Sequence, residues 1–291
     1  SVVEFNRQYP CSPEDAFHKS SSTIFDLAYL RKARSEYVFE PSPRTTLVGS
    51  PSGLQLLDDP EGIIQIWYPP EPYTEYVIGS DHAEGLDGRD FSAAIVLQRM
   101  PLRMVAKLRG FDGRQVSIDE FTEQLQMLGL YYNNAWICPE NNADGGTVIA
   151  LLQDKYEYQE IVSERDLGVV TSNRLGWRNQ SNTRRRGVGM VQESFHADDI
   201  EIPCAQTLNE AMNFVTINGK PQAIKKGKSR KPGEAETGFY DDLVFSLVGA
   251  LYAEHSRPPA KSKKYLESQF HSARFREVNL PEKTDHWSKY V

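Results

Sequence analysis

The stretch Tyr76–Arg109, YVIGSDHAEGLDGRDFSAAIVLQRMPLRMVAKLR, decides the fold. It opens with a short apolar run that ends in an acid, Asp81, and Ala93–Leu97 is a second apolar run of strand length. In Leu102–Arg109, apolar and polar residues largely alternate, which is typical of a strand with one wetter face. Three adjacent strands joined by short turns predict an antiparallel meander.

A helix and a fourth strand are predicted directly after the meander. Ser117 and Glu120 form a capping box that begins the helix, and its apolar residues fall on one face up to Gly129. Ala135–Cys138 then has the pattern of a strand, and Glu140 lies at its end. Because this strand is reached through a helical crossover, we expect it to run parallel to the first strand.

The remaining patterned segments complete an α/β fold. Gly146–Gln153 and Leu208–Phe214 are predicted helices, and Tyr156–Val162 is a predicted strand. Leu243–Ala253 is apolar on nearly every side, which predicts a buried helix. We therefore expect a mixed sheet, in which the three-stranded meander is joined by parallel strands and helices cover both faces.

The two ends of the chain are less regular than its centre. Prolines interrupt residues 1–72 repeatedly, so this part is predicted to be a connector that packs on the main domain, with short strand-like pieces and no long helix. Residues 73–255 are the expected main domain, and 256–291 form a tail without clear periodicity. A chain of 291 residues with 39% hydrophobic content can bury one substantial core.

Charge restricts how this protein could bind nucleic acid. A net charge of −7 excludes coating of DNA by the whole surface, because affinity for phosphate comes from Lys and Arg. Two stretches without acids, 174–186 and 220–231, form local basic patches that are either solvated loops or contacts for backbone phosphates. Trp177 could stack on a base or belong to the core. The candidate DNA-binding residues are Arg184, Arg185, Arg186, Lys225, Lys226, Lys228, Arg230 and Lys231.

Several classes of protein are excluded by the motifs that the sequence lacks. Three widely spaced cysteines make neither a disulfide framework nor a four-cysteine zinc site. No apolar stretch approaches the roughly 18 residues of a membrane span, and no signal-peptide core is present, so we expect a soluble, intracellular protein without a membrane partner. The H-E-x-x-H, G-x-S-x-G and phosphate-loop motifs are absent, which predicts no zinc hydrolase, no nucleophile elbow and no ATPase site.

Four acids are predicted to share one edge of the sheet. Asp81 and Glu140 close buried strands, and Asp241 and Asp242 open the buried helix. Clustered carboxylates repel one another unless a cation lies among them, and Mg²⁺ or Mn²⁺ takes oxygen ligands of this kind. Two ions roughly 4 Å apart could activate a water and stabilise the leaving oxygen of a phosphodiester, with Asp81 bridging both ions. Each acid alone could instead be an ordinary turn, surface or N-cap residue.

The same residues carry a resemblance to a known family. YVIGSDHAEGLDGRDFSAAIVL (Tyr76–Leu97), WICPENNADGG (Trp136–Gly146) and GFYDDLVFSLVGALYA (Gly238–Ala253) resemble, in order, three acidic motifs of the nuclease domain of the terminase large subunit of tailed phages. NRQYPCSPEDAF (Asn6–Phe17) is similar to the segment after that family's motor domain, and TLNEAMNFV (Thr207–Val215) to the helix before its last acidic motif. Cys138 and Pro139 before Glu140 depart from the family pattern.

This resemblance implies an RNase H-like fold and an endonuclease that cuts double-stranded phage DNA concatemers during genome packaging. It implies two Mg²⁺ or Mn²⁺ ions at Asp81, Glu140, Asp242 and Asp241, supported by Asp90. His82, next to Asp81, is either an indirect contact of a metal or phosphate or an exposed turn residue. The implied partners are the ATPase motor of the same polypeptide, the portal and the small terminase subunit, in the cytoplasm of an infected bacterium.

Two other functions fit the same residues. Another RNase H-like nuclease, such as a RuvC-like resolvase or a transposase core, would share the acidic plan but would not explain the Asn6–Phe17 segment. A noncatalytic module that docks on the portal or motor would retain the carboxylates as remnants. Cleavage of linear against branched DNA separates the first alternative, and metal binding separates the second.

Overall fold

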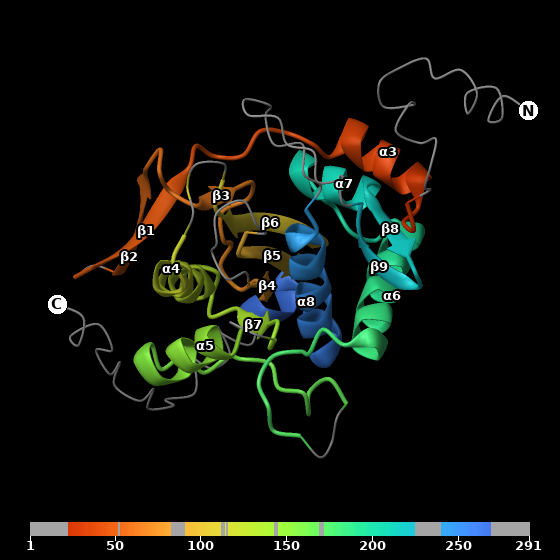
Figure 1. Ribbon diagram of the computed structural model, residues 1–291. Helices are drawn as coiled ribbons and strands as arrows, with labels where there is room; N and C mark the ends of the chain where they lie inside the picture. The colour runs from red at the N-terminus through yellow and green to blue at the C-terminus, as the bar shows by residue number, and fades with distance from the viewer. Residues whose placement is uncertain are drawn as a thin grey trace, which may run out of the picture.

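The computed structural model describes residues 23–51, 53–82, 91–111, 114, 116–142, 145–168, 172–224 and 240–268. These residues form a seven-stranded mixed sheet in the order β2-β1-β3-β6-β5-β4-β7, together with a small β8-β9 hairpin (Figure 1). The strands are β1 (Thr45–Ser50), β2 (Gly53–Asp58), β3 (Ile64–Ile66), β4 (Tyr76–Asp81), β5 (Ala93–Arg99), β6 (Leu102–Arg109), β7 (Trp136–Pro139), β8 (Phe214–Ile217) and β9 (Lys220–Ala223). The helices are α3 (Leu27–Glu36), α4 (Ile118–Tyr131), α5 (Gly145–Ala150) with a π-helical turn (Leu151–Lys155), α6 (Ser181–Ala197), α7 (Ala205–Met212) and α8 (Asp242–Ser256).

The predicted meander is confirmed. β4 pairs with β5 and β5 with β6, both antiparallel, so Asp81 lies opposite Ala93. β7 pairs parallel to β4, with Ser80 opposite Pro139, as the helical crossover predicts. The backbone N–H of Glu140 donates to the carbonyl of Ser80 at 2.8 Å, so Glu140 follows β7 directly beside the end of β4.

The sheet extends further toward the N-terminus than the sequence suggests. Residues 45–66 were expected to be a connector with short strand-like pieces, and they form the strands β1, β2 and β3. That these strands join the main sheet was not predicted, because β3 pairs with β6, which lies far away in the sequence. Before them, the short helix α3 contacts α6 and α7, where Tyr29 stacks on Phe195 with ring centroids 4.3 Å apart.

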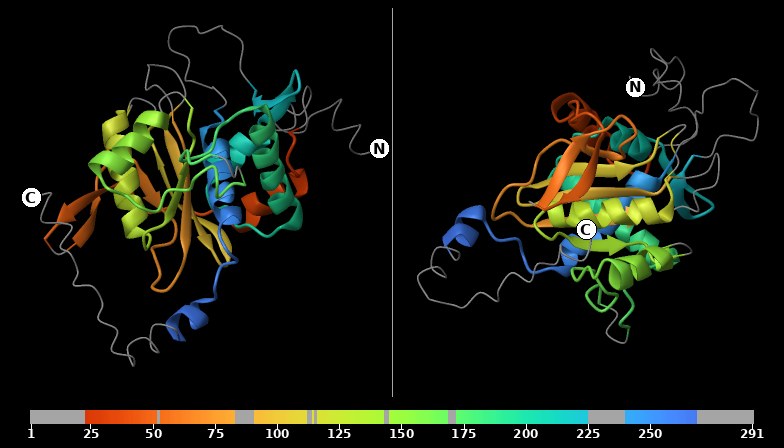
Figure 2. Two further views of the ribbon diagram at one scale, coloured as in Figure 1. Left: turned by 90° about the horizontal axis from the view of Figure 1, so that it is seen from below. Right: turned by 90° about the vertical axis from the view of Figure 1, so that its left-hand side faces the viewer.

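Helices cover both faces of the sheet, as predicted (Figure 2). One hydrophobic core joins α4 and the region around α5 to residues such as Ile78 and Val96. The other joins α8, α6, α7 and α3 to residues such as Val77 and Ile95, which alternate with the first set along the same strands. None of the helices in the described part of the chain combines the length and apolar character needed to cross a lipid bilayer.

Helix α8 packs unusually closely on β4 because glycines face each other. A β-carbon on Gly79 of β4 would lie 2.0 Å from both the Ala250 nitrogen and the Ser246 oxygen of α8. Such distances are impossible for a side chain, so only glycine permits this approach. The Ser246 hydroxyl also donates to the carbonyl of Ala93 at 3.0 Å, which ties α8 to β5.

Three local predictions need correction. Tyr156–Val162 is not a strand: it follows a π-helical turn, Glu157 has a φ of 50°, and one isolated bridge joins Ile161 to Ile137. Helix α4 continues past Gly129 to Tyr131. The arginine run 184–186 is not a loop but the first part of α6, because Val188, Val191 and Phe195 give this segment a buried helical face.

Candidate active site

Three separate elements deliver the four predicted acids to one region. Asp81 is the last residue of β4, Glu140 follows β7, and Asp242 begins α8 with Asp241 before it. Since β4 and β7 are parallel neighbours and α8 packs on both, their ends lie together. The sequence prediction that these acids are neighbours therefore agrees with the geometry.

Repulsion within this group is strong at Asp81. Burial raises the pKa of this half-buried carboxyl well above its usual range, and the nearby Glu140, Asp242 and Asp241 raise it further, with a hydrogen bond between Asp81 and Glu140. Two carboxylates that interact in this way repel each other unless they share a proton or a cation. The donor set, all carboxylate oxygen, fits a hard divalent ion such as Mg²⁺.

The carboxylates are neighbours without converging on one point. Within the described ranges, no three Asp, Glu, His or Cys side chains are arranged to hold a metal ion as they stand. The acids interact instead with donors of the protein itself.

Glu140 is held by two amides. Asn142 donates to its Oε1 at 2.9 Å and Asn179 to its Oε2 at 3.0 Å. The Nε of Arg184 donates to the Oδ1 of Asn179 at 2.7 Å, which orients that amide. Neither asparagine was predicted as a contact of the site, although the Asn-rich stretch after Glu140 is visible in the sequence.

Asp242 lies at the most buried position of the group, with 1% of its surface exposed. Its Oδ2 accepts from the backbone N–H of Phe91 at 3.1 Å and from the Nη2 of Arg109 at 3.2 Å. Asp241 accepts from the backbone N–H of Ala223 in β9 at 3.1 Å. Arg109 thus supplies one positive charge to the site, a role that its place in an alternating strand did not reveal.

Glu210 is a fifth acid that sequence analysis missed. Its Oε2 accepts from the backbone N–H of Leu243 at 2.8 Å, so it caps the start of α8 from the neighbouring helix α7. Burial raises the pKa of Glu210 to about 7, against the lowering effect of nearby Arg109. The first turn of α8 is therefore bordered by three acids, which its helix dipole favours.

His82 is not the fully exposed turn residue that one interpretation expected. Its Nε2 lies 3.2 Å from the Ser80 hydroxyl, and its ring packs edge-on against Phe121 with centroids 5.4 Å apart. Burial lowers the pKa of His82 to about 3, so the ring is neutral at physiological pH. Asp90, the other predicted supporting residue, lies outside the described residues.

Part of the predicted basic surface borders the acids. Arg184 and Arg185 line a cavity of about 460 Å³ between the start of α6 and the β8-β9 hairpin, together with Lys220. Burial lowers the pKa of Arg184, and the charges of Asp241, Glu140 and Asp81 oppose this change. Arg186 instead donates to the carbonyl of Leu167 at 3.3 Å and does not line the cavity. Lys225, Lys226, Lys228, Arg230 and Lys231 lie outside the described residues.

Trp177 belongs to the core. It is 1% exposed, and its ring lies 5.4 Å from that of Tyr252 in α8. Its backbone N–H donates to the carbonyl of Pro139 at 2.9 Å, which fixes the loop that carries Asn179 beside Glu140. Stacking on a nucleotide base is excluded by this burial.

The fold defined by this sheet and its helices is that of a phage terminase nuclease, an RNase H-like fold. The large terminase nuclease of thermophilic phage G20c with bound magnesium matches with a TM-score of 0.53 and 15% identity, over 80% of this chain and 97% of that one. The same nuclease with bound cobalt matches with a TM-score of 0.52, 15% identity and the same coverage. No protein-family model and no curated protein matches the sequence. The resemblance stated from sequence is confirmed at the level of the fold.

Proposed function

We propose that this protein is a metal-dependent endonuclease that cleaves double-stranded phage DNA concatemers during genome packaging. One observation carries the proposal: acids from β4, β7 and α8 meet at the edge of a sheet whose fold is shared with a magnesium-bound nuclease. The raised pKa of Asp81 supports a site that requires a cation to be fully ionised.

Asp81, Glu140, Asp242 and Asp241 would hold two Mg²⁺ or Mn²⁺ ions. Bound ions would supply activation of a water and stabilisation of the leaving 3′ oxygen. Asn142 and Asn179 orient Glu140, and Arg109 together with the Phe91 N–H orients Asp242. These contacts keep the carboxylates in place while the substrate phosphate approaches.

The DNA backbone would lie along the cavity that Arg184, Arg185 and Lys220 line. Arg184 joins this surface to the acids, because it bonds to Asn179 and Asn179 bonds to Glu140. Contacts of this kind position DNA without reading its sequence. The lysines and arginines of 225–231 would extend the same surface.

The partners that we propose are an ATPase motor of the same polypeptide, the portal and the small terminase subunit, in the cytoplasm of the infected host. The terminase identity of the neighbours in fold supports them. Cleavage of long linear DNA in preference to branched junctions would separate this function from that of a resolvase.

A noncatalytic docking module is the second candidate. The observation that favours it is the arrangement of the described acids, which do not converge on a metal position as they stand. A single experiment decides: supercoiled plasmid is incubated with the protein and Mg²⁺ or Mn²⁺, with and without EDTA, and metal binding is measured by calorimetry. EDTA-sensitive nicking with metal binding establishes the nuclease, and the absence of both establishes the docking module.

A further inference from the structure

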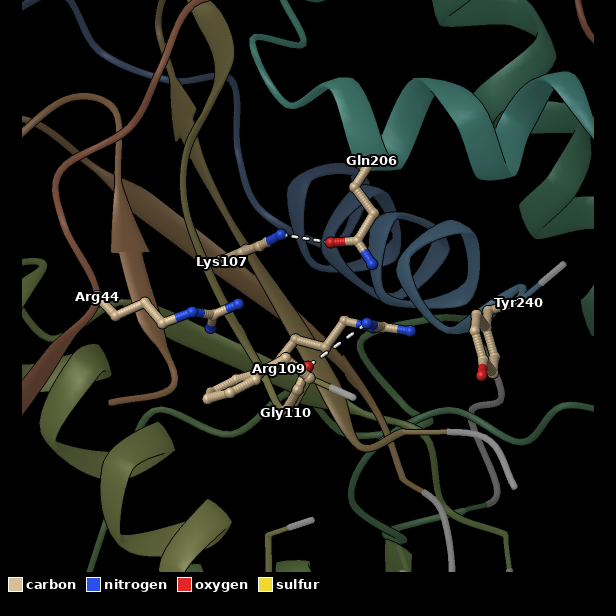
Figure 3. Close-up of a pocket in the computed structure, with 7 residues that line it drawn as sticks. Arg44, Lys107, Arg109, Gly110, Gln206 and Tyr240 are labelled. Carbon is tan, nitrogen blue, oxygen red and sulfur yellow. Dashed lines mark hydrogen bonds between the residues drawn. The ribbon is translucent and has the colours of Figure 1, made fainter. Parts of the chain in front are cut away.

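A second cavity, of about 220 Å³, is lined by Arg109, which also donates to Asp242 of the acidic site. Figure 3 shows the side chains that line it. Its walls are the end of β6 and the turn after it, the residue before β1, the start of α7 and the residue that precedes Asp241. The described lining residues are Arg44, Lys107, Arg109, Gly110, Phe111, Gln206 and Tyr240. Three of them are cationic, and none of these described residues is acidic.

These three cations are largely removed from water. Lys107 is 7% exposed and Arg109 5%, and Arg44 is half-buried. Burial lowers the pKa of Arg44, and repulsion from Arg109 lowers it further. Burial also lowers the pKa of Lys107, and the positive charges of Arg109 and Arg44 lower it further. Asp242 forms an ion pair with Arg109 at 3.2 Å, whereas the charges of Glu210 and Glu61 oppose the lowering at Lys107 and Arg44. Cations gathered at low exposure destabilise the fold unless anions compensate them.

Several donors in this cavity are not used by the protein. Within the described part of the chain, the Nε of Arg109 is buried without a hydrogen-bond partner. The Arg44 guanidinium donates no side-chain hydrogen bond within the described residues, and it lies over the Phe111 ring, 3.8 Å from its centroid. A cation–π contact of this kind involves the face of the guanidinium and leaves its N–H groups available as donors. Lys107 donates to the Oε1 of Gln206 at 2.5 Å, which uses one of its three protons.

We propose that this cavity, here called the Arg44 pocket, binds a phosphate group. Two guanidinium groups and an ammonium match a tetrahedral oxyanion, because planar N–H pairs bind two oxygens at once and the ammonium adds a point charge. A carboxylate offers two oxygens in one plane, whereas the oxygens of a phosphate point in several directions and can contact all three cations. The phosphate chemistry has two sources: a backbone phosphate of bound DNA, or a free phosphate ion.

The DNA source rests on the proposed nuclease function. Arg109 lines the Arg44 pocket and donates to Asp242 from the same guanidinium, so the pocket adjoins the acids. A backbone phosphate held in the Arg44 pocket would fix the position of the DNA strand near the phosphodiester that is cut. The pocket would then set how far the substrate strand slides relative to the acids, which is a positioning function.

The test uses the whole 291-residue chain and the variants Arg44→Gln, Arg44→Lys and Lys107→Met. Arg103→Gln is the matched control: Arg103 lies over the Tyr68 ring at 4.0 Å, but the Glu71 carboxylate is 3.5 Å away and neutralises it. Calorimetry with inorganic phosphate in EDTA measures the pocket without any cleavage. Binding of a short DNA duplex in EDTA, over a range of salt concentrations, measures the DNA source.

We expect Arg44→Gln and Lys107→Met each to weaken phosphate binding about tenfold or more, with Arg44→Lys in between and Arg103→Gln unchanged. If DNA fills the pocket, Arg44→Gln also weakens DNA binding, lowers its salt slope by about one charge, and phosphate competes with DNA. Unchanged DNA binding assigns the pocket to free phosphate. The proposal is overturned if Arg44→Gln and Lys107→Met bind phosphate as tightly as the unmutated protein does and also bind DNA as tightly as it does. Because phosphate binding needs no cleavage, a protein that binds phosphate but never cuts DNA would sink only the nuclease function.

Discussion

Gly79 of β4 and Gly249 of α8 touch backbone to backbone: a β-carbon on Gly249 would lie 3.1 Å from the Cα of Gly79. Asp81 follows Gly79 by two residues, and Asp242 begins the same helix that contains Gly249. The separation between these two acids therefore depends on how closely the strand and the helix approach. The glycine in YVIGSD is part of the acidic site even though it has no side chain.

Replacing Gly79 with Ala should destabilise the fold by roughly 3 kcal/mol or more, because the new methyl would meet helix backbone that cannot move aside. Urea denaturation measures the loss. Gly49→Ala in β1 is the control, since a β-carbon there meets nothing within 4 Å. Equal stability of the two variants would show that the contact is not tight in solution.

Asp81→Asn should separate stability from activity. Without metal, the amide can donate to Glu140 and removes a repulsive charge, so the free energy of unfolding in EDTA should rise by about 1 kcal/mol. Metal-dependent plasmid nicking should fall below about one per cent, while DNA binding persists. Asp58→Asn, exposed at the end of β2, is the control for both measurements. Retained nicking in Asp81→Asn would remove Asp81 from the proposed metal ligands.

Asn179→Ala should slow cleavage about tenfold or more, because Glu140 loses one of the two amides that orient it. The metal concentration needed for half-maximal nicking should also rise in Asn179→Ala. Asn209→Ala, on the exposed side of α7, is the matched control and should match the unmutated rate. A rate loss without any change in metal requirement would argue that Asn179 contacts DNA rather than supports Glu140.

Glu210→Gln should change how stability depends on pH. The pKa of Glu210 is raised from 4.5 to about 7, so the folded protein binds more protons than the unfolded chain between these values. The contribution of this group to stability is therefore present below pH 4.5 and is lost as the pH rises through 7. Gln removes that loss and can still accept from the Leu243 N–H, so its advantage over the unmutated protein should grow with pH by about 1 to 3 kcal/mol.

Urea denaturation in EDTA across this pH range checks the Glu210 prediction, with Glu193→Gln on the exposed side of α6 as the control. A difference between Glu210→Gln and the unmutated protein that stays constant with pH would mean that Glu210 is ionised throughout. In that case the positive charge of Arg109 stabilises the Glu210 carboxylate by at least as much as burial destabilises it.

The cavity beside α6 should contribute phosphate contacts. The double variant Arg185→Gln with Lys220→Gln should bind duplex DNA more weakly and lower the salt slope by about two charges, since both exposed cations line that cavity. Arg31→Gln with Lys264→Gln is the control, because these exposed cations line neither cavity. Equal slopes in both double variants would place the DNA elsewhere on the protein.

The sequence predicted the elements whose pattern is local and strong. The alternation in Leu102–Arg109 and the apolar run before Asp81 predicted β6 and β4 almost to the residue. The apolar stretch Leu243–Ala253 predicted α8, which continues three residues further, to Ser256. The acids were also identifiable, because each one ends or begins such an element. Their place at one edge followed from the parallel pairing of β4 and β7.

The sequence could not reveal contacts that exist only between distant elements. Arg109 looks like one polar residue of an alternating strand, and Glu210 like one acid of an amphipathic helix, until the fold brings them to Asp242 and Leu243. Short strand-like pieces were predicted before the meander, but their place in the main sheet depends on the pairing of β3 with β6, which is distant in the sequence. The helix at 181–197 was recognisable, since Val188, Val191 and Phe195 have helical spacing, but the arginine run drew the interpretation toward a loop.

The distribution of the acids over β4, β7 and α8 also has a consequence for the newly made protein. During translation Asp81 is synthesised first and Asp242 last of the four acids. Helix α8 must then pack on β4 before all four carboxylates lie together. A nascent chain that has not yet reached residue 242 thus has an incomplete set of ligands. If the proposed activity is correct, an incompletely synthesised chain cannot cleave host or viral DNA, because activity requires the complete fold.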